Sequence, residues 1–155
     1  MAQPQRPGGF DMARMTTGSK VVLVTAILLF IDLFFPWQGV DFGDFLGTDL
    51  GSANVSGFNG LGILVAILCI AVIVWEGMLA AGVNVSMGST SPALIGAALA
   101  GATALFTIIA FLTKLSAIKW GAFVGLILGL VMAYGAYLRF QESKAGGMAP
   151  PPPAA

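Results

Sequence analysis

Four long apolar runs alternate with shorter polar segments along this chain, at roughly residues 20–36, 60–79, 92–112 and 120–140. A helix needs about 17–25 mainly apolar residues to cross the hydrocarbon core of a bilayer. The pattern therefore predicts four transmembrane helices within residues 20–140. The expected fold class is all-α, a membrane four-helix bundle with flexible ends.

The segments outside the four runs are predicted to be irregular. Residues 1–19 and the Pro-rich residues 141–155 have the composition of disordered tails. The connection at residues 37–59 contains five glycines and no long apolar run, which predicts an irregular external loop.

The first run could instead belong to a cleaved signal peptide, because a basic segment precedes it. No small-x-small cleavage site follows, and the run ends in the bulky residues Phe34, Phe35, Pro36 and Trp37. A retained membrane anchor is the favoured interpretation, with Trp37 in the aromatic belt at the membrane surface.

The distribution of basic residues predicts the orientation. Cytoplasmic segments of a membrane protein carry an excess of Lys and Arg. We therefore expect both termini in the cytoplasm of a multi-pass cell-membrane protein. The inner segments then contain Arg6, Arg14, Lys20, Arg139 and Lys144, and the outer segments contain Lys114 and Lys119.

Composition supports a membrane protein and excludes several chemistries. Of the 155 residues, 57% are hydrophobic and 9% are charged, whereas a soluble domain has about a quarter of its residues charged. No basic stripe suits nucleic acid. The chain contains one cysteine, Cys69, and no histidine, so a zinc site and a histidine base are not expected. We expect no catalytic residues, no metal and no cofactor, and thus no enzyme.

Small residues recur at helical spacing in the last two runs. Gly121, Gly125 and Gly129 follow one another every four residues, and Gly96 and Gly101 lie in the alanine-rich third run. Such rows let two membrane helices approach closely. The favoured prediction is a tight contact between the third and fourth runs, and the alternative is a homodimer.

Asp32 and Glu76 are the acids within the apolar runs and the candidate functional residues. An acid inside a bilayer is costly and is a functional candidate by default. Asp32 lies near the external end of its run and Glu76 near the cytoplasmic end of its own, so they belong to opposite leaflets. The simplest expectation is an interfacial acid that reaches water or one basic partner. Candidate partners are Lys114 or Lys119 for Asp32, and Lys20 or Arg139 for Glu76.

Three stretches carry a family resemblance: residues 16–38 (TTGSKVVLVTAILLFIDLFFPWQ), 74–77 (VWEG) and 119–143 (KWGAFVGLILGLVMAYGAYLRFQES). In them the chain resembles uncharacterised small four-helix integral membrane proteins of actinobacteria. The resemblance implies a plasma-membrane protein with four spans. It assigns no active residue.

The leading hypothesis is a non-enzymatic accessory or scaffold subunit of a cell-envelope membrane complex. Its partners would be the lipid bilayer and another membrane protein or further copies of itself, without nucleic acid. The alternative is a small transporter or channel subunit that uses Asp32 or Glu76. A membrane enzyme comes third, since it would require the external aspartates to converge on a metal.

Overall fold

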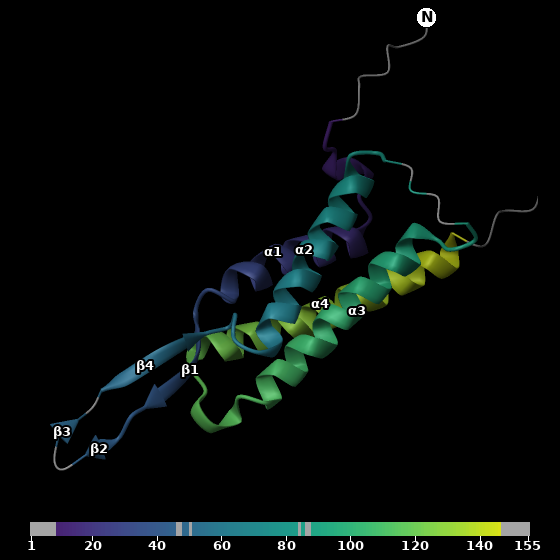
Figure 1. Cartoon of the computed structure of the whole chain (residues 1–155). Helices are drawn as coiled ribbons and strands as arrows, with labels where there is room; N and C mark the ends of the chain where they lie inside the picture. The colour runs from purple at the N-terminus through teal and green to yellow at the C-terminus, as the bar shows by residue number, and fades with distance from the viewer. Residues whose placement is uncertain (1–8, 46–47, 50, 84, 86–87, 147–155) are drawn as a thin grey trace, which may run out of the picture.

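The computed structural model describes residues 9–45, 48–49, 51–83, 85 and 88–146, and the chain is mainly helical there (Figure 1). The α-helices are α1 (Thr17–Asp32), α2 (Leu61–Ala80), α3 (Pro92–Leu112) and α4 (Trp120–Ala145). Within the described residues, α2, α3 and α4 are long and apolar enough to cross a membrane, whereas α1 has only 16 residues. Two short 3-10 turns, η1 (Met12–Arg14) and η2 (Leu115–Ala117), precede α1 and α4.

Local sequence sets the first turns of α1 and α3. The side chain of Thr16 accepts a hydrogen bond from the backbone N–H of Ser19, and that of Ser91 accepts one from Leu94. Pro92 then occupies the first turn of α3, where its missing N–H costs nothing. These caps pair backbone donors that a helix start otherwise leaves free.

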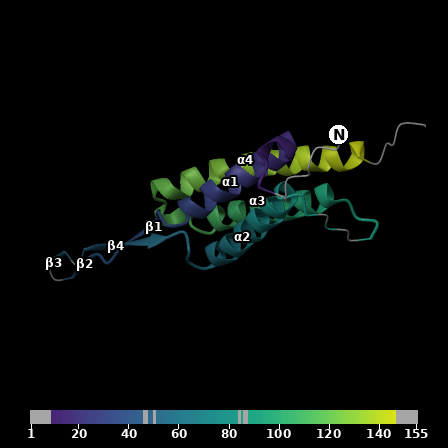
Figure 2. The same ribbon diagram turned by 90° about the horizontal axis from the view of Figure 1, so that it is seen from above.

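The four helices pack in a ring in which each contacts its neighbours in sequence, and α1 closes the ring against α4 (Figures 1 and 2). The contact between α3 and α4 is the most extensive. Neighbouring helices are antiparallel, so the start of α1 lies beside the ends of α2 and α4. We call this the inner end of the bundle, and the opposite end the outer end.

Apolar side chains line both the interior and the exterior of the ring. A middle core cluster includes Val22, Val72 and Met132, and an outer cluster includes Leu29, Trp37 and Phe111. Large apolar side chains are also exposed on every helix. They include Ile27 and Ile31 on α1, Ile67 and Val74 on α2, Leu105 on α3, and Ile127 and Leu130 on α4.

The predicted irregular loop at residues 37–59 is wrong in its central part, because this segment forms a β-hairpin. Strand β1 (Pro36–Asp41) pairs antiparallel with β4 (Ser52–Ser56), and the short β2 (Asp44–Phe45) pairs with β3 (Thr48–Asp49). Gly43 and Gly51, which have positive φ angles of 71° and 80°, lie between the two strand pairs. The hairpin extends past the outer end of the bundle (Figures 1 and 2).

The expected all-α class is wrong for residues 36–56, where the strands of the hairpin lie. Two predicted boundaries also need correction. The N-terminal tail does not extend to residue 19, because η1 and the first turn of α1 lie there and Met15 is buried. The C-terminal tail does not begin at residue 141, because α4 continues to Ala145. Residues 1–8 and 147–155 of the predicted tails lie outside the described residues.

Candidate functional site

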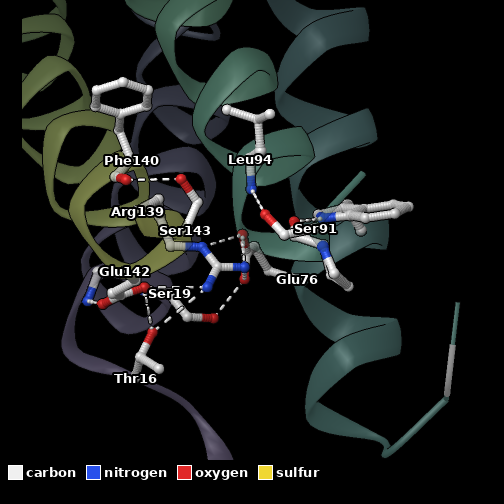
Figure 3. A network of polar contacts seen from close by, with 12 residues as sticks. Thr16, Ser19, Glu76, Ser91, Leu94, Arg139, Phe140, Glu142 and Ser143 are labelled. Atoms are coloured by element: carbon white, nitrogen blue, oxygen red, sulfur yellow. Dashed lines mark hydrogen bonds and ion pairs between the residues drawn. The ribbon is translucent and has the colours of Figure 1, made fainter. Parts of the chain in front are cut away.

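Glu76 and Arg139 form a buried ion pair at the inner end of the bundle (Figure 3). Nε of Arg139 donates to Oε1 of Glu76 at 3.1 Å, and Nη2 donates to Oε2 at 3.2 Å. The hydroxyl of Ser19 also donates to Oε2 of Glu76. Glu76 is 0% exposed and Arg139 is 4% exposed. Both oxygens of this carboxylate therefore already accept hydrogen bonds, from α1 and from α4.

Glu142 extends this network to the start of α1. Its Oε2 accepts from Nη1 of Arg139 at 3.1 Å and from the hydroxyl of Thr16 at 2.8 Å. Its Oε1 accepts from the backbone N–H of Gly18 at 3.0 Å. A carboxylate at a helix N-terminus is favoured by the helix dipole and satisfies a free N–H. Glu142 on α4 thus caps α1 across the bundle.

Gly96 makes room for the ion pair instead of serving only helix packing. A methyl group on Gly96 would lie 2.6 Å from Oε1 of Glu76 and 3.1 Å from Nε of Arg139. A larger residue at this position would therefore require the ends of the Glu76 and Arg139 side chains to shift. Between the two partners left open for Glu76, the structure selects Arg139 and not Lys20.

The inner network is suited to holding helices together and poorly suited to carrying a proton. A buried ion pair is tolerated when the remaining hydrogen-bonding positions are satisfied, and removing one partner costs about 3–5 kcal/mol because the other charge is left unpaired. Glu76 meets that condition through Ser19 and Arg139. Of the two alternatives expected for Glu76, water or one basic partner, the structure shows the basic partner, Arg139.

Asp32 and Lys114 occupy the outer end in a very different way. They are 3% and 6% exposed. Neither Oδ1 of Asp32 nor Nζ of Lys114 has a hydrogen-bond partner among the described residues. Among the described residues, neither candidate partner, Lys114 or Lys119, forms an ion pair with Asp32. Burial lowers the pKa of the Lys114 ammonium, because desolvation disfavours its charged form.

Trp37 lies against both of these groups. Its Nε1 donates to Oδ2 of Asp32 at 3.1 Å, and Nζ of Lys114 lies 5.7 Å from the centre of its ring. Trp37 is 0% exposed, so its expected place in the aromatic belt at the membrane surface is wrong. The indole is instead a core side chain that anchors β1 to the bundle.

Three glycines form the space around Trp37. Added methyl groups on Gly125, Gly121 and Gly57 would each meet its indole, and the one on Gly125 would also lie 2.9 Å from Oδ2 of Asp32. The row on α4 therefore divides: Gly121 and Gly125 face Trp37, and a methyl group on Gly129 would lie 3.1 Å from Thr107 on α3. Sequence spacing identified the row but could not identify the tryptophan opposite it.

Gly101 differs from the other glycines predicted to pack helices. An added methyl group there would meet no atom within 4 Å. Gly101 therefore lies away from the contact between α3 and α4 that the sequence predicted for it.

A hollow of about 570 Å³ lies between the start of α3 and the end of α4. Its polar lining comes mainly from hydroxyl groups, with Glu142 as its titratable side chain. Within the described part of the chain, no group of three or more His, Cys, Asp or Glu residues could hold a metal ion.

Comparisons with protein-family models, curated proteins and solved structures find no match to this chain. The interpretation of both polar sites therefore depends on their geometry.

Proposed function

We propose that this protein is a non-enzymatic accessory subunit of a cell-envelope membrane complex, and that its external hairpin docks on a partner membrane protein. The main support for this proposal is the hairpin itself. It has an apolar face, and it projects from the outer end of an apolar bundle (Figure 2).

The two faces of the hairpin differ in polarity. Residues directly opposite one another in an antiparallel pair lie on the same face, so the strand pairing shows which residues each face contains. Val40 pairs with Ala53, and Val55 pairs with Gln38. The pairs of the other face are Gly39 with Asn54 and Asp41 with Ser52. Val40 is 43% exposed, and the neighbouring Phe42 is 58% exposed. One face is therefore largely apolar and the other polar.

The length of the hairpin favours a protein partner over lipid for this apolar face. Six residues of extended strand span about 20 Å. The hairpin continues in the direction of the bundle axis (Figures 1 and 2). In the proposed topology its outer part would therefore lie beyond the bilayer. An apolar face held there is typical of a protein interaction site.

The proposed topology has four spans with both termini in the cytoplasm. At 1.5 Å per residue, α1 is about 24 Å long, somewhat short of a hydrocarbon core of about 30 Å. Its outward side is apolar and continues into the exposed Phe34 and Phe35. Exposed apolar side chains on all four helices support a lipid-facing exterior around α1 as well as the longer helices.

Site-specific photo-crosslinking tests the docking proposal. A photoreactive residue is placed at Val40 on the apolar face or at Asn54 on the polar face, and the protein is purified from its native membrane. We expect one unlike membrane protein in stoichiometric yield from position 40 and much less from position 54. Val40→Ser should then lose this partner, and Asn54→Ala should retain it. A homogeneous monomer or homo-oligomer without such a partner would contradict the proposal.

A small transporter or channel subunit is the second candidate, and the unpartnered oxygen of Asp32 favours it. Glu76 is the weaker choice, because Arg139 and Ser19 already use its oxygens. Flux through reconstituted liposomes separates the two candidates. Loss of flux in Asp32→Asn would favour transport, and full flux in that variant would count against it.

A further inference from the structure

The outer end of the bundle contains an acidic and a basic side chain that are both buried against a single indole ring. Asp32 lies at the last turn of α1, and Lys114 follows α3. Trp37 on β1 contacts both, through its N–H and through its ring face. Within the described chain, one carboxylate oxygen and the ammonium have no hydrogen-bond partner.

This arrangement is energetically unfavourable for the two charged groups. A buried charge is stable when it is paired and hydrogen-bonded, and it is costly otherwise. A cation over an aromatic ring at this distance gives only about 0.5–2 kcal/mol. Asp32 and Lys114 would compensate one another directly if they met. The side chain that each of them contacts instead is Trp37.

We propose that Trp37 is a removable wedge between Asp32 and Lys114. In the docked state the hairpin is held on its own bundle by Trp37, and in the released state Trp37 has withdrawn and Asp32 and Lys114 form an ion pair. In the docked state described here, the indole fills the space bounded by the three glycines and keeps the charges unpaired. In the released state, the ion pair replaces the contacts that Trp37 loses. The hairpin is thereby coupled to the ends of α1 and α3.

The backbone of the same region links hairpin movement to Lys114. The carbonyl of Trp37 accepts a hydrogen bond from the N–H of Lys119 at 3.0 Å, and Gln38 forms a β-bridge with Ile118. The segment after Lys114 is therefore attached to β1 beside the wedge. Displacement of β1 would pull on this segment at the same time as it withdraws the indole. The proposal concerns the chain alone and does not require that the hairpin docks on a partner.

The wedge proposal predicts that the effect of Lys114→Met on the melting temperature changes sign when Trp37 is replaced. In the otherwise unchanged protein, Lys114→Met removes an unpaired buried charge while keeping similar volume, so the melting temperature in detergent should rise. In a Trp37→Leu background the ion pair is free to form, and Lys114→Met should then lower the melting temperature. The same sign in both backgrounds would overturn the proposal.

A second measurement avoids Trp37 variants in case Trp37→Leu does not fold. Trp75→Phe and Trp120→Phe leave Trp37 as the single tryptophan, and acrylamide quenching of its fluorescence measures the released fraction. In this single-tryptophan protein, Asp32→Asn, Lys114→Met and the double variant make up a double-mutant cycle. If the charges meet on release, the released fraction should show a non-additive coupling of about threefold or more. Additive effects, or equal protection of Trp37 in all four proteins, would overturn the proposal.

Discussion

At the scale of single residues, the two buried acids have opposite environments. Glu76 accepts hydrogen bonds from Arg139 and Ser19, whereas Asp32 has one oxygen without a partner among the described residues. The sequence identified both acids and placed them near opposite ends of the bundle. It could not choose between Lys20 and Arg139 for Glu76, because the choice depends on which side of α4 faces α2.

The inner ion pair gives the first prediction. Arg139→Met leaves the Glu76 charge unpaired and should lower the free energy of unfolding by about 3–5 kcal/mol. The double change Glu76→Met and Arg139→Met removes both charges and should recover most of that loss. Thermal melting in detergent measures both effects. A control is Arg14→Met, since the ion pair of Arg14 with Asp11 is exposed and such pairs contribute less than about 1 kcal/mol. Equal losses in the single and double variants would contradict this account.

Two glycines of the bundle provide a matched pair for the second prediction. Gly125→Ala should destabilise the protein and expose Trp37, because its methyl group would overlap the indole. Gly101→Ala meets no atom within 4 Å and should be neutral or stabilising by up to about 1 kcal/mol, since alanine favours the helix. Melting temperature and tryptophan fluorescence together distinguish the two variants. A neutral Gly125→Ala would show that this glycine is not needed for the Trp37 site.

At the scale of elements, the hairpin and the inner ends of α1 and α4 depart from what the sequence pattern predicted. In β1 the register shifts between Pro36 and Gln38, so Trp37 lies within a bulge and the alternation of a regular strand is interrupted there. The helix α4 continues for five residues past its apolar run because Glu142 has partners on α1. Both features depend on contacts with other elements.

The cap that α4 provides for α1 is the basis of the third prediction. Glu142→Gln removes the charge that accepts from Thr16 and Gly18, at a cost of about 1–2 kcal/mol. Amide hydrogen exchange in the first turn of α1 should accelerate by about tenfold, with little change at the outer end. Lys144→Gln is the control, because Lys144 makes no ion pair with the described residues. Unchanged exchange in α1 would show that Thr16 caps the helix without help from α4.

At the scale of the whole molecule, the ring of antiparallel helices has the start of α1 and the end of α4 at its inner end and the hairpin at its outer end. The proposal of a fourth span depends on the apolar exterior of α1, which has only 16 residues. If α1 did not cross, the N-terminal segment and the end of α4 would lie on opposite sides of the membrane.

Cysteine labelling of intact cells tests this topology, in a Cys69→Ala background. We expect a membrane-impermeant maleimide to label Asn54→Cys in the hairpin without permeabilisation. Cysteines at the exposed Ala13 and Lys144 should react only after the membrane is opened. Ala13→Cys is decisive for α1, and its labelling from outside would reduce the number of spans to three.

The amino-acid sequence alone predicts the mainly helical architecture and the location of the apolar helices, because length and hydropathy act locally along the chain. It also identified Asp32, Glu76 and the glycine row as unusual positions, because acids and regularly spaced glycines are conspicuous within apolar runs. The contacts of these residues depend on the tertiary structure. Glu76 forms an ion pair with Arg139, Asp32 accepts a hydrogen bond from Trp37, and Gly125 leaves room for the Trp37 indole. A partner is selected by the rotation of one helix against another and by a hairpin folded between them, and neither is encoded in local periodicity.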